Sequence, residues 1–134
     1  MSAARILVVD DQADVCGLAA LMLRKAGYEV NTVGSGAGAL AQIQEIRYDM
    51  VLLDINMPGM DGWEVLRVLK ADAGTANLPV AMFSVRGEVR DKVHGIQEGA
   101  IDYITKPFAY EEITGRVAAI LRKAAGQQQR EQSR

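Results

Sequence analysis

Five short apolar segments alternate with five helical patterns along the chain, and this alternation restricts the fold more than any other feature. The apolar segments are residues 5–9, 29–33, 50–53, 79–83 and 102–104. Nearly continuous apolar strands separated by helices are typical of a parallel sheet that is buried on both faces. Right-handed crossovers leave few topologies open. We predict an α/β fold with a five-stranded parallel sheet, strand order 2-1-3-4-5, and helices on both faces.

Each predicted helix has an apolar stripe or an end signal. The first ends at Gly27, and its stripe is Val15, Leu18, Ala19, Met22 and Leu23. The next three are expected at about 37–46, 63–70 and 88–98. The fifth ends near Lys123 and buries Ile113, Val117, Ile120 and Leu121. We place one domain at residues 4–123. Residues 124–134, with three consecutive glutamines, are interpreted as a disordered polar tail or the start of a linker.

Charge and composition exclude several classes of protein. Residues 1–121 hold 16 of the 17 acidic residues but 11 of the 15 basic ones, which argues against direct nucleic-acid binding by this domain. No apolar run approaches the roughly 20 residues of a membrane helix. The N-terminus lacks a signal-peptide pattern, and the single Cys16 cannot form an internal disulfide. We expect a cytoplasmic protein that does not associate with membranes.

Polar residues follow four of the apolar segments. Asp10 and Asp11 end the first, Asp54 ends the third, Ser84 follows the fourth and Lys106 follows the fifth. The carboxyl ends of parallel strands meet at one sheet edge, where open α/β folds bind ligands. Three carboxylates there repel one another, and Mg²⁺ is the hard cation that would offset them. Asp54 could then attack a phosphoryl donor, while Lys106 and Ser84 contact the transferred group.

Each of these residues also has a simpler interpretation. Asp10 and Asp11 alone would be read as a helix N-cap and a neighbouring acid. Ser84 alone would be a turn residue, and Tyr103 an ordinary strand aromatic. Only the combination of Asp10, Asp11, Asp54 and Lys106 favours the metal and phosphoryl interpretation.

Four stretches together resemble the receiver domain of two-component response regulators. They are Val8-Val9-Asp10-Asp11, the segment 54–62, Ser84 after the fourth strand, and the segment 103–108. The resemblance covers about residues 4–123 and implies the flavodoxin-like receiver fold. It implies that Asp54 is the phosphoacceptor and that Asp10 and Asp11 hold Mg²⁺ together with the backbone carbonyl of Asn56. It also implies that Ser84 and Lys106 read the phosphoryl group, that Tyr103 is an aromatic switch, and that the Lys106–Pro107 bond is cis.

The resemblance also implies partners. A sensor histidine kinase or a phosphotransfer protein would supply the phosphoryl group. Phosphorylation would change the surface formed by the fourth helix, fifth strand and fifth helix, which would control a partner or an attached output domain. Charged residues there match those that pair across the active dimer of receivers joined to winged-helix domains. They are Lys92, Glu98, Asp102, Glu112, Arg116 and Lys123.

Other functions fit the residues less well. A flavin-binding protein of this topology needs a phosphate-cradling loop after the first strand, where Asp10 and Asp11 would repel phosphate. An aspartyl-phosphate phosphohydrolase would have an Asp-x-Asp pattern there, which Asp10-Asp11-Gln12 lacks. The remaining alternative is a receiver-like interaction scaffold that is not controlled by phosphate. We expect a switch that accepts phosphate on itself and assists its own dephosphorylation, not a turnover enzyme.

Overall fold

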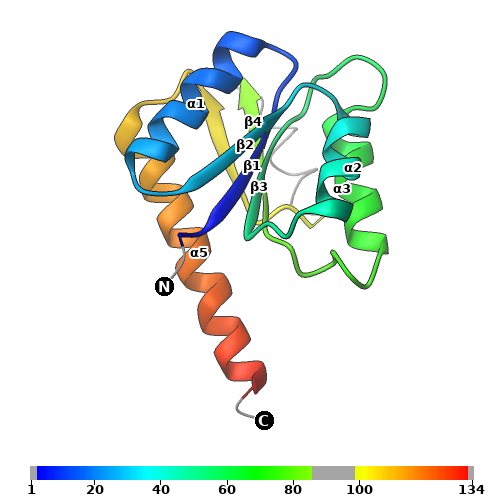
Figure 1. The fold of residues 1–134 in the computed structure, drawn as a ribbon, viewed down its shortest axis with the longest axis vertical. Helices are drawn as coiled ribbons and strands as arrows, with labels where there is room; N and C mark the ends of the chain where they lie inside the picture. The colour runs from blue at the N-terminus through cyan, green and yellow to red at the C-terminus, as the bar shows by residue number, and fades with distance from the viewer. Residues whose placement is uncertain (1–2, 86–98, 133–134) are drawn as a thin grey trace.

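The computed structural model describes residues 3–85 and 99–132, in which strands and helices alternate as predicted (Figure 1). The strands are β1 (Arg5–Val9), β2 (Glu29–Val33), β3 (Met50–Asp54), β4 (Val80–Val85) and β5 (Asp102–Lys106). The helices are α1 (Ala13–Lys25), α2 (Gly36–Glu45), α3 (Gly62–Ala71) and α5 (Tyr110–Gln132). The helix predicted at 88–98 lies outside the described residues.

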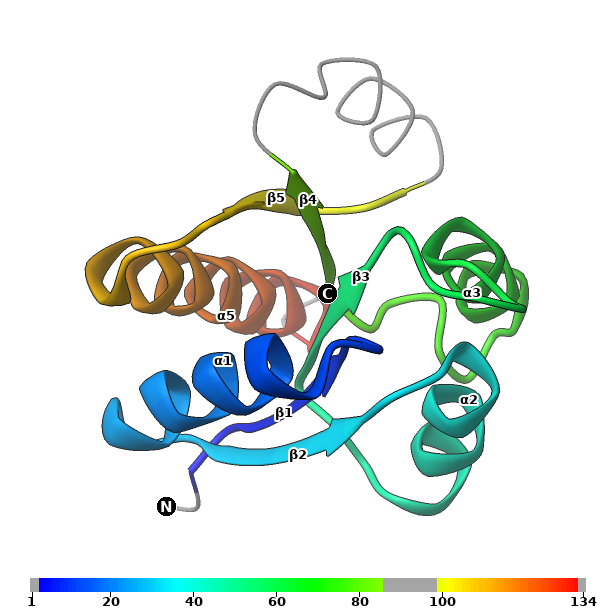
Figure 2. The same ribbon diagram turned by 90° about the horizontal axis from the view of Figure 1, so that it is seen from above.

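The sheet has the predicted topology. Its order is β2-β1-β3-β4-β5, and every neighbouring pair is parallel. Helices α1 and α5 cover one face, and α2 and α3 cover the other (Figure 2). Each face has its own apolar cluster, one centred on Ile6, Val8 and Phe83 and the other on Leu7, Val9 and Met82. Burial on both faces explains why the strands are apolar without alternation.

Three strands extend further than their apolar segments. β3 ends at Asp54, β4 at Val85 and β5 at Lys106, so Asp54 and Lys106 are the last residues of their strands. The ladder continues because the backbone pairs regardless of side-chain polarity: Asp54 is opposite Phe83, and Val85 is opposite Lys106. The polar residues at this edge are therefore held by the sheet itself.

The predicted apolar stripe of α1 is partly wrong. The buried residues of this helix are Cys16, Ala19, Ala20 and Leu23, whereas Leu18 is 47% exposed. Cys16 is buried where Leu18 was expected, and its thiol donates to the carbonyl oxygen of Val8 at 3.6 Å. Positions 16, 19, 20 and 23 lie on one helical face, and Leu18 lies outside it.

Helix α5 continues beyond Lys123, where its apolar pattern ends. It runs to Gln132 and projects past the sheet (Figure 1), so the expectation of a disordered segment is wrong for residues 124–132. These residues are mainly Ala, Gln, Arg and Glu, which are good helix formers, and none is proline. A helix nucleated by packed residues elongates into such a segment without further burial. Its use as a linker stays a prediction.

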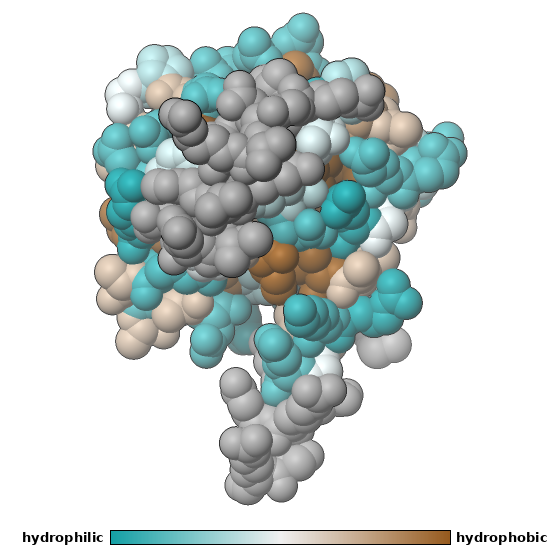
Figure 3. Space-filling model, turned by 180° about the vertical axis from the view of Figure 1, so that it is seen from behind, coloured by the Kyte–Doolittle hydropathy of each residue, from teal (hydrophilic) through white to brown (hydrophobic). Residues whose placement is uncertain are grey.

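On the face shown in Figure 3, the atoms coloured by hydropathy are mostly hydrophilic, with a small apolar area near the middle. Within the part of the chain that the structure describes, no helix has the length and apolar character needed to span a bilayer.

Candidate functional site

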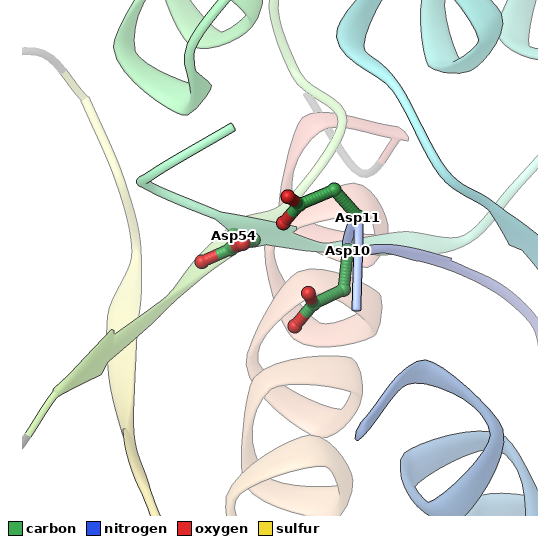
Figure 4. A group of neighbouring side chains, drawn as sticks. All are labelled: Asp10, Asp11 and Asp54. Atoms are coloured by element: carbon green, nitrogen blue, oxygen red, sulfur yellow. The ribbon is translucent and has the colours of Figure 1, made fainter. Parts of the chain in front are cut away.

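The three predicted carboxylates lie together at the carboxyl edge of the sheet (Figure 4). β1 and β3 are neighbours, and Val9 is paired with Leu53, so Asp10 and Asp54 follow at adjacent positions. One oxygen from each of Asp10, Asp11 and Asp54 lies within 4.8 Å of the other two. Asp10 is 1% exposed and Asp54 is 6% exposed, whereas Asp11 is open to solvent. The cluster is therefore reached from the Asp11 side.

Lys106 joins the two buried carboxylates from the end of β5. Its Nζ donates to Asp10 Oδ2 at 2.7 Å and to Asp54 Oδ1 at 3.1 Å. The ammonium thus bridges residues 96 and 52 positions away in the sequence, and its side chain is only 17% exposed. A buried carboxylate pair without a cation would be strongly disfavoured, so this contact compensates much of the charge.

The compensation is incomplete at Asp54. Burial raises the pKa of this carboxyl to about 6, and the charge of Asp10 adds to the effect. Lys106 and the backbone N–H of Asn56 act in the opposite direction. At Lys106 burial lowers the pKa, but the hydrogen bond to Asp10 and the charges of Asp54 and Asp10 outweigh it, and its pKa is raised. The lysine is therefore cationic, and the site still carries excess negative charge at neutral pH.

The N-cap interpretation of Asp10 and Asp11 is wrong. Helix α1 begins at Ala13, and its N-cap is Gln12, whose side chain makes no capping hydrogen bond. Asp10 Oδ1 accepts from the backbone N–H of Gln12 at 2.9 Å, which shapes the turn after β1 and leaves Oδ2 for Lys106. The exposed Asp11 does not occupy the N-cap position of α1, and its interpretation as an acid favoured by the helix dipole stays a prediction.

The loop after β3 carries Asn56, whose predicted backbone contact with a metal stays a prediction. Asn56 is exposed, and Met57 beside it is buried. The loop closes at Gly62, whose N–H donates to the carbonyl of Ile55 at 2.9 Å. A Cβ atom at Gly62 would lie 2.3 Å from the carbonyl oxygen of Asp54, so only glycine fits there. Gly62 lies within the segment 54–62, for which the sequence predicts no such packing role.

The predicted switch residues Ser84 and Tyr103 lie in neighbouring strands. Ser84 lies in β4 opposite Thr105, which puts it at the same sheet edge as Asp54. Tyr103 is 9% exposed and belongs to the apolar cluster under α2 and α3. The Lys106–Pro107 bond is cis, as the resemblance implied.

The predicted interface residues are only partly described. Lys92 and Glu98 lie outside the described residues. Arg116 on α5 and Asp102 on β5 form an ion pair within the chain, with Nη1 at 3.1 Å from Oδ1 and 3.2 Å from Oδ2. Their side chains are 47% and 33% exposed. On the same helix, Lys123 is exposed and Glu112 is half-buried.

Sequence reasoning missed Phe83, which lies directly under the site. The Lys106 Nζ is over its ring, 5.6 Å from the centroid, and the Phe108 ring stacks on it at 5.5 Å. An aromatic residue immediately before Ser84 is the signal that could have indicated it. In chemical terms, the site offers hard oxygen ligands for a divalent cation, one buried carboxylate as a nucleophile, and a fixed ammonium for an anion.

Comparisons with known proteins identify the family of this chain. The family model of the response regulator receiver domain matches residues 6–118. The DNA-binding response regulator MtrA of Mycobacterium tuberculosis is 44% identical over 119 residues, which cover 89% of this chain and 51% of MtrA. The chain thus spans about half the length of the curated relatives it matches.

Solved structures share the fold. The chemotaxis response regulator CheY4 of Vibrio cholerae is 30% identical, with a TM-score of 0.84, covering 89% of this chain and 99% of CheY4. NtrX from Brucella abortus is 34% identical, with a TM-score of 0.93, covering 98% of this chain and 30% of NtrX. The chain therefore belongs to the response regulator receiver domain family of two-component signalling.

Proposed function

We propose that this chain is a phosphorylation-controlled switch in which Asp54 accepts a phosphoryl group from a histidine kinase or a phosphotransfer protein. The observation that carries the proposal is the Lys106 ammonium held between the buried carboxylates of Asp10 and Asp54, with Asp11 beside them. A purely structural ion pair needs one acid. Three acids around one lysine leave excess negative charge, and this charge favours the binding of a further cation.

Mg²⁺ fits this donor set. The carboxylates of Asp10, Asp11 and Asp54 and the backbone carbonyl of Asn56 would hold it, and all are the hard oxygen ligands that it prefers. When bound, the ion would neutralise charge on the acids and on the transferred phosphoryl group. The raised pKa of Asp54 supports the same assignment, because its cause is burial together with an acidic neighbour.

The protein's own residues would supply the rest of the chemistry. An ionised Asp54 oxygen attacks the phosphorus of the donor phosphohistidine, the phosphorus–nitrogen bond breaks, and its electron pair returns to the imidazole, which takes a proton. The product is an acyl phosphate on Asp54. Lys106 already donates to Asp54, so its ammonium is close enough to contact the oxygens of a phosphoryl group on that residue. The Ser84 hydroxyl is proposed to donate to a phosphoryl oxygen. Because Asp54 itself is modified, the protein is not a turnover enzyme.

The direct test is phosphoryl uptake from acetyl phosphate, followed by mass spectrometry of the intact protein. We expect one added phosphoryl group in the presence of Mg²⁺ and none after chelation by EDTA. Uptake that is equal with and without the metal would contradict the assigned carboxylates. No uptake under either condition would favour the receiver-like scaffold that is not controlled by phosphate.

Replacing Asp11 by alanine should weaken Mg²⁺ binding without destabilising the metal-free protein. The side chain is exposed, it does not cap α1, and its loss removes one of three mutually repelling charges. We expect the free energy of unfolding in EDTA to stay within about 0.5 kcal/mol of the original value or to rise. Urea denaturation measures this, and isothermal titration calorimetry with Mg²⁺ measures binding. A loss of about 1 kcal/mol or more would instead indicate a capping role.

We further propose that phosphorylation promotes self-association through β5, α5 and the segment before β5. Replacing Arg116 by glutamate should weaken this association, because it breaks the pair with Asp102 and puts two acids side by side. The fold should persist, since an exposed ion pair contributes less than about 1 kcal/mol. Light scattering with beryllofluoride as a phosphoryl mimic measures the mass.

Arg122→Glu is the matched control, because it makes the same charge change on an exposed residue of the same helix outside the predicted set. It should associate like the original protein. Exchanging the pair, with Arg116→Asp and Asp102→Arg together, should restore part of the association. A mass that beryllofluoride leaves unchanged at high protein concentration counts against this surface.

A further inference from the structure

The ring of Phe83 lies against the cationic end of Lys106. The Nζ atom is over the ring, 5.6 Å from its centroid, which is within the range of a cation–π contact. Phe83 is 1% exposed and lies within β4, so its ring has little freedom. The Lys106 side chain is 17% exposed, and a cation–π contact strengthens when the cation is desolvated.

A second aromatic ring holds Phe83 in place. Phe108 stacks on it with centroids 5.5 Å apart and an interplanar angle of 18°. Phe108 is two residues after Lys106, across Pro107. The chain therefore leaves β5 at Lys106 and returns onto the ring that the lysine side chain also contacts. One ring thus supports both the ammonium and the backbone next to it.

The backbone of Phe83 is fixed to the proposed phosphoacceptor. Phe83 is the partner of Asp54 in the β3–β4 ladder. Its carbonyl oxygen accepts from the N–H of Ile55 at 3.4 Å. Ser84 is the next residue along β4. A change in the ring at position 83 would therefore act on the geometry between Asp54 and Lys106.

We propose that Phe83 is a positioning residue whose ring holds the Lys106 ammonium in place for phosphoryl transfer to Asp54. The ammonium of a lysine has three N–H donors. Here two are used by Asp10 and Asp54. A ring attracts the charge without being a hydrogen-bond acceptor of the ordinary kind, so a donor can turn to a phosphoryl oxygen while the cation stays anchored. The attraction of the ring matters most during transfer, because an Asp54 oxygen then forms a bond to phosphorus and is less available to Lys106.

The inference rests on the proposed function. Its main test changes the negative electrostatic potential of the ring face while keeping the shape of the ring. Phenylalanine at position 83 is replaced by its mono-, di- and trifluorinated analogues, which weaken the negative face of the ring in steps. We expect the rate of phosphoryl uptake from acetyl phosphate to fall with each step, by about fivefold over the series. That corresponds to about 1 kcal/mol, the size of a cation–π contact.

The matched control is the same fluorinated series in a Lys106→Met background. Methionine fills a similar space without charge, so its residual rate should not depend on fluorination. Urea denaturation of each variant checks that the domain remains folded at the assay temperature. A rate that is flat across the series in the original background, or that falls equally in both backgrounds, overturns the proposal.

A second measurement needs no phosphate. Protons above an aromatic ring resonate upfield, so the ε-methylene protons of Lys106 should show an upfield NMR shift that Phe83→Leu removes. If the original protein takes up no phosphoryl group, the proposed function fails whatever the NMR shows. If uptake is normal but the shift is absent, or the fluorinated series is flat, the assigned role of Phe83 fails and the proposed function stands.

Discussion

Asp54→Asn should take up no phosphoryl group from acetyl phosphate, with Mg²⁺ present, in an assay that labels the original protein fully. The substitution keeps the size of the side chain but replaces an ionised oxygen by a neutral amide, which is a poor nucleophile. Intact-protein mass spectrometry measures the labelling. Asp61→Asn is the matched control: Asp61 caps α3 by accepting from the N–H of Glu64, and asparagine caps as well. This control should label normally.

Loss of labelling in Asp54→Asn should not come from unfolding. The pKa of Asp54 is raised to about 6 because its charged form is buried. Between its ordinary pKa and about 6, the unfolded state ionises while the folded state keeps the proton, so ionisation costs folding free energy above that range. Asparagine removes the cost. Its metal-free unfolding free energy at pH 8 should equal or exceed that of the original protein, and the difference should shrink toward pH 4. Labelling that persists in the variant would place the acceptor elsewhere.

The meeting of the polar residues at one sheet edge was predictable from where polarity changes along the chain, once the alternation of strands and helices had indicated a parallel sheet. Burial of the strands on both faces makes them apolar throughout, so each polar residue at a strand end stands out, as Asp54 does after Leu53. Parallel pairing then brings these ends to one edge. Asp10, Asp54 and Lys106 meet there although they are far apart in sequence. Strand polarity and topology were sufficient for that prediction.

Features that depend on packing were not predictable in this way. Leu18 is apolar yet exposed, and Cys16 is buried in its place, because the rotation of α1 on the sheet decides which face is covered. The end of α5 was placed too early, because loss of an apolar stripe does not end a helix whose residues favour helical structure. The aromatic residue before Ser84 indicates a ring near the site, but the contact of Lys106 with Phe83 depends on the side-chain positions across two strands.

Lys106→Met should destabilise the metal-free protein by about 3 kcal/mol at pH 8. It removes the cation between Asp10 and Asp54 and leaves two buried carboxylates without compensation, which is among the most costly changes in a folded protein. Methionine approximates the length of the lysine side chain, so loss of packing contributes little. Urea denaturation in EDTA at a series of pH values gives the free energy of unfolding.

The loss should depend on pH in a defined direction. Without Lys106, the pKa of Asp54 rises above its already raised value of about 6, because the attraction of the ammonium opposed the shift. At pH 5 Asp54 then keeps its proton in the folded state of both proteins, so its charge contributes nothing to the difference. Above the raised pKa the full cost appears. The variant should therefore differ least from the original protein at pH 5 and most at pH 8.

Combining Lys106→Met with Asp54→Asn separates charge from packing. With Asp54 neutral at every pH, the double variant should recover much of the lost free energy at pH 8, and its remaining loss should vary little between pH 5 and 8. Mg²⁺ should stabilise Lys106→Met more than the original protein, because the ion no longer competes with an ammonium for the same carboxylates. A loss that is equal at pH 5 and 8, and that Asp54→Asn leaves unchanged, would mean that Lys106 holds the fold by packing alone and does not compensate the acidic cluster.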